Sequence, residues 1–196
     1  MKDNSVKDSG KKKSRAASAA KEVVNFALYI AVVFVLTYLV IHYVGQRTEV
    51  SGSSMENTLH NGDNLIVDKI SYRFRDPERF DIIVFPYQYE ENTYYIKRII
   101  GMPGETVRID AKGIIYINGE ELVESYGREV ISASKLGLAE QEITLADDEY
   151  FVLGDNRNAS SDSRDPSVGN IKREDIIGRA WLRIYPFSKI GFIKHQ

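Results

Sequence analysis

The stretch Tyr94–Glu105, Y-Y-I-K-R-I-I-G-M-P-G-E, indicates the fold and contains an unexpected residue. Apart from two cations, its first seven residues are β-branched or aromatic, which is typical of a β-strand that ends at the turn formers of G-M-P-G. Alternate side chains of a strand share a face, so Lys97 would lie beside Tyr95 while Arg98 points to the other face. A lysine among apolar side chains is unusual, because burial disfavours its charged form.

Short apolar runs on both sides of this stretch predict further strands. They are Leu65–Val67, Asp81–Phe85, Thr106–Ile109, Glu149–Leu153 and Ile176–Tyr185. A hairpin is expected at Gly113–Leu122, because Asn118-Gly119 favours a type I′ turn. We therefore expect a mainly β fold, with antiparallel sheets forming a partial barrel and a small inserted β/loop region at about residues 107–147.

The chain begins with a basic segment followed by an apolar run. Met1–Glu22 has seven Lys or Arg against three acids, or +4, which leaves −6 for the rest of a chain of net charge −2. Val23–Gln46 has no Asp, Glu, Lys or Arg, and as a helix it would rise about 36 Å, enough for a bilayer core of about 30 Å. We predict a cytoplasmic basic tail at residues 1–22, one transmembrane helix at 23–46 and an extracytoplasmic catalytic domain at 47–196, since positive flanks stay inside.

The alternative for the apolar run is a cleavable signal peptide. Such a peptide has a shorter apolar region that is followed directly by a small-x-small site. Here the run ends in H-Y-V-G-Q-R at His42–Arg47, which is a poor site for cleavage. We therefore expect an uncleaved anchor in the cell membrane, with the lipid bilayer as a partner.

Composition excludes several classes of function. There is no cysteine, so disulfides and thiolate metal sites are excluded. The acidic body of the chain argues against nucleic acid as a partner. No motif calls for a metal or an organic cofactor, and we expect none.

A serine-rich turn at Ser51–Leu59, S-G-S-S-M-E-N-T-L, offers candidate nucleophiles. A serine hydroxyl needs a base, which is usually histidine. None of the three histidines, His42, His60 and His195, is well placed by sequence. Lys97 is the better candidate if burial lowers its pKa from about 10.4. The alternative is a strand-edge lysine whose charged end reaches water.

A polar loop at Gly154–Arg164, G-D-N-R-N-A-S-S-D-S-R, follows an apolar strand. Its side chains could form a buried network that orients Lys97. Ser160 could hydrogen-bond the lysine amine, and Asp162 could pair with Arg164. Taken alone, the composition fits a solvated turn equally well.

Four segments in this order resemble the bacterial type I signal peptidases, which are membrane-anchored Ser/Lys proteases. The serine turn is similar to S-G-x-S-M-x-P-T-L, and Y-I-K-R-I-I-G-M-P-G-E to Y-V-K-R-x-I-G-x-P-G-D. The polar loop is similar to G-D-N-R-x-x-S-x-D-S-R, and Arg79–Phe85, R-F-D-I-I-V-F, to R-G-D-I-V-V-F. Each segment alone is a modest signal, but four in order behind an anchor are highly specific.

The resemblance implies a role for each matched residue. Ser54 would be the nucleophile and Lys97 the general base, with the Ser160 hydroxyl hydrogen-bonded to the amine. The supporting residues would be Asp155, Arg98, Asp162 and Arg164, and the residues near shallow substrate pockets would be Met55, Leu59 and Tyr95. No cofactor is implied.

Three positions depart from the family pattern. Gly52 stands where some relatives have a serine that donates to the oxyanion, so backbone N–H groups, including that of Ser54, would have to serve instead. Asn57 replaces the usual proline, which would restrict φ in that turn. Phe80 replaces a glycine of the strand motif, which suggests a change in packing.

The function implied by the resemblance is a serine endopeptidase that cleaves N-terminal signal peptides from exported precursor proteins through an acyl-enzyme. One alternative, suggested by Asn57, is a specialised Ser/Lys protease that matures one surface or pilus protein. Another is a non-catalytic, membrane-tethered module that binds extended peptides.

Overall fold

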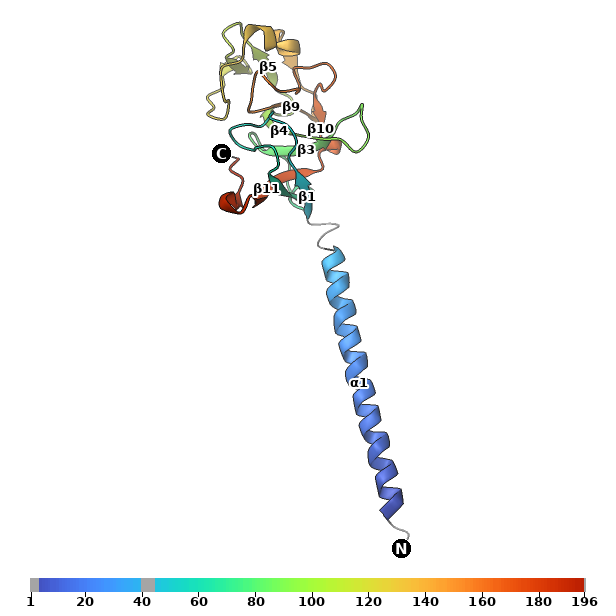
Figure 1. Ribbon diagram of the computed structural model, residues 1–196. Coiled ribbons are helices and arrows are strands. Elements are labelled where there is room, and N and C mark those ends of the chain that lie inside the picture. Colours follow the sequence, from blue (N-terminus) through green and yellow to red (C-terminus); the bar gives the residue numbers. More distant parts are fainter. Residues whose placement is uncertain (1–3, 40–44, 196) are drawn as a thin grey trace. The chain divides into compact units, whose positions relative to one another are not determined.

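A computed structural model describes residues 4–39 and 45–195, in two compact units, Met1–Tyr43 and Val44–Gln196. The first unit contains the helix α1, Asn4–Leu39 (Figure 1). Its segment Lys21–Leu39, with a mean hydropathy of 2.0, is long and apolar enough to cross a bilayer, so the expected apolar helix is confirmed. Of the predicted anchor, residues 40–44 lie outside the described residues, and its last two residues belong to strand β1.

Helix α1 begins at Asn4, far ahead of the apolar run. The basic segment, predicted as a cytoplasmic tail, continues the same helix. Its many Lys and Ala residues have high helix propensity. Extending an existing helix also avoids the unfavourable nucleation step.

An eight-stranded sheet forms most of the second unit. Its strands are β1 Gly45–Glu49, β2 Asn64–Asp68, β3 Ile82–Pro86, β4 Tyr94–Gly101, β9 Glu149–Leu153, β10 Ile171–Lys172, β11 Gly178–Tyr185 and β12 Gly191–Phe192. The order is β1-β2-β11-β3-β4-β9-β10, with β12 paired to β11, and every pair is antiparallel. The predicted mainly β, antiparallel fold is confirmed.

A second, four-stranded sheet comes from the middle of the chain. Its strands, in the order β7-β6-β5-β8, are β5 Thr106–Ile109, β6 Ile115–Ile117, β7 Glu120–Glu121 and β8 Ile143–Thr144. Asn118 and Gly119 have φ of +52° and +81°, the left-handed conformation that a type I′ hairpin turn requires. The short 3₁₀ helices are η2 Ser71–Arg73, η3 Ala133–Lys135, η4 Gly137–Glu140, η5 Arg173–Asp175 and η6 Phe187–Lys189.

Four strands were not expected from the sequence: β1, β8, β10 and β12. Strand β1, G-Q-R-T-E, has no apolar alternation and lies at the edge of its sheet, paired only with β2. The other three are two residues long. Such segments become strands through pairing with a neighbour, which a local pattern does not report.

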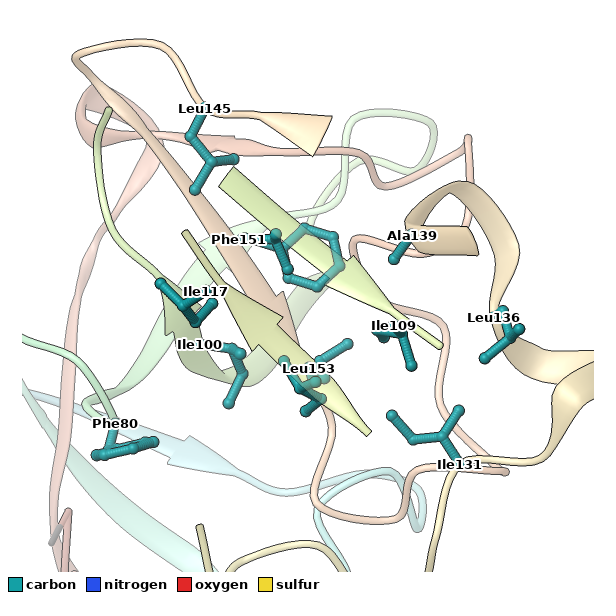
Figure 2. Close-up of a cluster of buried hydrophobic side chains, with 12 residues drawn as sticks. Phe80, Ile100, Ile109, Ile117, Ile131, Leu136, Ala139, Leu145, Phe151 and Leu153 are labelled. Atoms are coloured by element: carbon teal, nitrogen blue, oxygen red, sulfur yellow. The ribbon is translucent and has the colours of Figure 1, made fainter. Parts of the chain in front are cut away.

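The core joins the two sheets and supports the segment that carries Ser54. Figure 2 shows the first cluster, in which Ile100 and Phe151 of the large sheet and Ile109 and Ile117 of the small sheet turn toward each other. A second cluster contains Val50, Met55, Leu59, Leu65, Val67, Ile82, Val84, Ile96, Ala180 and Ile193. The turn between β1 and β2 is thus held by its own buried side chains.

Candidate active site

Ser54 lies in the turn between β1 and β2, on a backbone that the core holds in place. Its neighbour Met55 is 2% exposed and Leu59 is fully buried. The amides of Thr58 and Leu59 both donate to the Met55 carbonyl, at 3.0 and 2.8 Å. The half-buried Ser54 side chain is therefore presented by a rigid turn.

Lys97 lies in β4, and its amine reaches the serine hydroxyl. Lys97 Nζ is 2.8 Å from Ser54 Oγ and 3.0 Å from the Ile96 carbonyl oxygen. The same amine lies 5.0 Å from the centre of the Tyr95 ring, as expected for alternate residues on one face of a strand. Two residues 43 positions apart thus meet within hydrogen-bond distance.

The amine is shielded from water. Lys97 is only 4% exposed, and this burial lowers its pKa from 10.5 to about 8, although the carboxylates of Asp162 and Asp155 favour the charged form. About a tenth of the amine is then neutral at pH 7 and about half at pH 8. A neutral amine can accept the proton of a serine hydroxyl.

The backbone of the polar loop packs directly against the serine turn. The Asn156 amide donates to the Ser54 carbonyl at 3.0 Å, and the Asn156 side chain donates to the Ser53 carbonyl at 3.0 Å. A Cβ at Gly154 would lie 2.5 Å from the Ser54 carbonyl oxygen, so no larger residue fits there without displacing the turn. The sequence prediction did not include Gly154 and Asn156; their only signal was the G-D-N at the end of an apolar strand.

Asp162 and Arg164 pair inside this loop. Arg164 Nε donates to Asp162 Oδ1 at 2.8 Å, and both residues are buried. Asp162 Oδ2 also accepts the Gly154 amide at 3.0 Å. The pair therefore sets the position of the glycine that contacts the serine turn.

Ser160 does not contact the lysine amine as expected. Its Oγ has no hydrogen-bond partner among the residues that the structure describes, while the Lys97 amine uses Ser54 and Ile96. The Ser160 hydroxyl instead faces Gly154. Its role in orienting the lysine stays a prediction.

Arg98 and Asp155 form a buried bidentate pair on the opposite face of β4. Arg98 Nε and Nη2 donate to the two Asp155 oxygens at 2.9 and 2.8 Å, and neither side chain is exposed. Thr58 Oγ1 also donates to Asp155. This pair ties β4 to both the polar loop and the serine turn.

The three departures from the family pattern share one backbone property. Gly52, Asn57 and Phe80 all have positive φ, at +94°, +88° and +70°. The Gly52 amide donates to Asn61 Oδ1 at 2.9 Å and is therefore engaged within the protein. Phe80 is 7% exposed, and its ring lies 5.1 Å from that of Tyr126, so packing offsets the strain of its backbone.

A cavity of about 260 Å³ opens beside Ser54 and Lys97. It is lined by Thr48, Glu49, Val50, Ser51, Gly52, Ser53, Ser54, Met55, Tyr94, Tyr95, Ile96, Lys97, Ala159 and Ser161. Met55 and Tyr95, expected near substrate, line it, whereas Leu59 lies in the core instead. The His60 imidazole lies next to two other side chains, with Nε2 3.5 Å from a Glu56 oxygen and Nδ1 4.0 Å from an Asp63 oxygen.

Comparisons with known proteins agree on one family. A family model described as "Signal peptidase, peptidase S26" matches residues 22–185. The chain is 36% identical to a probable signal peptidase I-2 of Synechocystis sp., over 98% of this chain and 86% of that protein. It is 40% identical to a signal peptidase I of Leptolyngbya laminosa, over 76% and 73% of the two chains. A crystal structure of a signal peptidase I from Enterococcus faecalis V583 aligns with a TM-score of 0.44 at 37% identity, covering 54% of this chain and 97% of that one. The chain therefore belongs to the signal peptidase family, peptidase S26, and is a hydrolase of the bacterial type I signal peptidase class.

Proposed function

We propose that this chain cleaves signal peptides from exported precursor proteins, with Ser54 as the nucleophile and Lys97 as the general base. The main support for this proposal is the 2.8 Å distance between Ser54 Oγ and Lys97 Nζ, together with the burial of the lysine amine. The substrate class is taken from the relatives, which are signal peptidases by name.

In the acylation step, neutral Lys97 accepts the Ser54 proton while Oγ attacks the carbonyl carbon of the scissile peptide bond. The resulting tetrahedral intermediate carries a negative oxygen. Within the residues that the structure describes, the Ser54 amide has no hydrogen-bond acceptor and is free to donate to that oxygen. The lysine ammonium then protonates the leaving amine, the C–N bond breaks, and an ester to Ser54 remains.

In the deacylation step, Lys97 is neutral again and accepts a proton from water. The hydroxide attacks the ester carbonyl carbon, and the C–Oγ bond breaks. Ser54 regains a proton from the ammonium, and the carboxylic acid at the end of the signal peptide releases its proton to bulk water as the peptide leaves as a carboxylate. The base and nucleophile return to their starting states.

An extended substrate can pair with β4 beside the site. On its β9 side, β4 pairs only through Arg98, Ile99 and Gly101, so residues 94–97 have no strand partner there in the described part of the chain. Backbone addition along this edge would lay the substrate over the cavity that holds Ser54. Small side chains near the scissile bond fit a cavity of about 260 Å³.

Replacement of either residue should abolish cleavage. Ser54→Ala removes the nucleophile and Lys97→Met removes the base, so each should lower kcat/KM for a precursor by about a thousandfold or more. Exposed Ser134→Ala and Lys112→Ala are matched controls and should process precursor normally. Cleavage by the purified, folded Ser54→Ala or Lys97→Met protein at the rate of its control would exclude the proposed dyad.

The pH profile tests the lysine separately. Because the pKa of Lys97 lies at about 8 and the neutral amine is the active form, kcat/KM should rise with pH to a midpoint near 8. Below that midpoint the rate should fall about tenfold per pH unit. A profile that stays flat down to pH 6 would exclude a lysine base.

We further propose a single-pass topology with the amino terminus in the cytoplasm and the catalytic domain outside. The support is the +4 charge of Met1–Glu22 ahead of the apolar part of α1. Protease added to intact spheroplasts should then digest an epitope at the carboxyl end and spare one at the amino end. The reverse pattern would refute this orientation.

A further inference from the structure

We infer that His195 is a positioning residue of the active site: it holds Arg98, and through Arg98 the Asp155 carboxylate and the loop that supports Ser54. This inference rests on the proposed function, because it assigns His195 to the geometry of the Ser54 nucleophile. Two of its contacts lie on the strand pair β3–β4: His195 Nδ1 accepts the Ile82 amide, and the His195 carbonyl accepts a hydrogen bond from Arg98.

Arg98 joins segments that are distant in the chain. Besides its two bonds to Asp155, Nη1 donates to the Phe80 carbonyl at 3.0 Å and to the His195 carbonyl at 3.3 Å. The Tyr126 ring covers the guanidinium, with its centre 3.8 Å from Cζ. A planar guanidinium with fixed partners on every side has one orientation available.

Arg98 in turn sets the position of the serine turn. Its partner Asp155 accepts a hydrogen bond from Thr58, four residues after Ser54. Asn156, which follows Asp155 in the chain, donates its amide to the Ser54 carbonyl at 3.0 Å. A shift of Arg98 therefore reaches the nucleophile through two hydrogen-bonded connections.

His195 is itself held on the core. Its Nδ1 accepts the Ile82 amide at 3.0 Å and lies 3.4 Å from Asp81 Oδ1. Two residues earlier, the Ile193 amide donates to the Trp181 carbonyl at 2.9 Å, and its side chain is 8% exposed. Ile82 is the register partner of Arg98. The hydrogen bond from Ile82 to the imidazole therefore holds the backbone carbonyl of His195 beside the Arg98 guanidinium.

The imidazole must be neutral to make this contact. Nδ1 can accept the Ile82 amide only when it carries no proton. Burial lowers the pKa of His195 to about 4, so the ring is neutral at the pH where Lys97 is active. The same acceptor geometry is available to an asparagine, whose side-chain oxygen can occupy the place of Nδ1.

The test compares His195→Ala and His195→Asn with wild type in the full-length chain in detergent micelles, with a precursor as substrate. His195→Ala should lower kcat by roughly tenfold with KM within about twofold, since a misplaced nucleophile slows chemistry more than binding. His195→Asn should restore kcat. The exposed neighbour Lys194→Ala is the matched control and should match wild type.

The pH profile gives a readout that a purely structural role would not change. Asp155 favours the charged form of Lys97, and Arg98 offsets that carboxylate. In His195→Ala a looser Arg98 leaves more of the Asp155 charge acting on the lysine, so the acidic midpoint of kcat/KM should move to higher pH.

Two outcomes with the alanine variant would overturn the inference. One is an unchanged kcat in folded His195→Ala; the other is a loss that His195→Asn does not repair. If the alanine variant does not fold, His195→Gln against His195→Asn decides, because glutamine places its oxygen one bond too far and should be slow. Equal rates for these two variants would refute the role.

Ser54→Ala in the same assay distinguishes the two proposals. Continued cleavage by Ser54→Ala refutes the proposed function. An inactive Ser54→Ala together with a fully active His195→Ala refutes only the positioning role.

Discussion

Asn57 shows how one residue can report the shape of the turn that carries Ser54. Its φ of +88° lies in a region that proline, with φ near about −65°, cannot enter. The turn therefore differs in shape from one built on the family's proline. Asparagine is among the residues that enter this region most readily.

Asn57→Pro should consequently be harmful, although it restores the family pattern. We expect the unfolding free energy to fall by about 1–3 kcal/mol, because the native φ at this position is closed to proline. Cleavage of precursor should fall with it, since residue 57 lies three positions after Ser54. Urea unfolding and a cleavage assay measure both, and Asn57→Gly, which tolerates positive φ, should stay close to wild type. A proline variant as stable as wild type would show that the turn adopts another φ.

Hydrogen bonds within the loop Gly154–Arg164 and to the segment before β8 hold the loop in one conformation. Arg164 Nη1 donates to the Lys135 carbonyl at 2.9 Å, and Nη2 donates to the Arg157 carbonyl at 2.6 Å. Asn158 Oδ1 accepts the Ser132 amide at 2.8 Å. A solvated turn, the alternative that composition allowed, would not be fastened at these points.

Arg164→Lys should therefore loosen this loop. Lysine keeps the charge but not the planar set of donors that reaches Asp162, Lys135 and Arg157 at once. We expect a loss of about 1–3 kcal/mol in unfolding free energy and faster amide hydrogen exchange within residues 154–164. Arg128→Lys, at an exposed arginine of the same region, is the matched control. Wild-type exchange rates in the Arg164 variant would contradict this account.

For the molecule as a whole, His195 makes folding stability depend on pH. Its pKa falls from 6.5 to about 4, because burial outweighs the attraction of Asp81 and acts together with the repulsion of Arg179 and Arg98. The unfolded chain therefore takes up this proton first as the pH falls. The contribution of neutral His195 is complete above pH 6.5 and is lost toward pH 4.

This loss can be isolated by comparing wild type with His195→Asn. Between pH 6.5 and 4, wild type should lose unfolding free energy relative to the variant by up to about 1.4 kcal/mol per pH unit, because asparagine does not titrate. Urea unfolding at pH 7 and pH 5 measures the difference. A constant difference between the two proteins would show that folding does not lower the pKa of His195.

The elements that could be predicted are those with a strong local pattern. The apolar helix and the strands around Lys97 follow from runs of one residue class, and the hairpin follows from Asn118-Gly119. Strand β1 could not be predicted, since its polar sequence becomes a strand only by pairing with β2. Ser54 and Lys97 were singled out by type and motif, whereas Gly154 carries no chemical signal of its own and His195 was set aside because its position in the sequence did not favour it.

By itself the sequence determined that a lysine lies in a strand beside Tyr95, behind an apolar helix and ahead of a polar loop. These are local properties, because period and composition act over a few neighbouring residues. Only the tertiary structure decided that Lys97 is buried and hydrogen-bonded to Ser54, and that the His195 carbonyl accepts a hydrogen bond from Arg98. Burial and hydrogen bonding between such distant residues depend on which segments pack together, and that packing is a property of the whole domain.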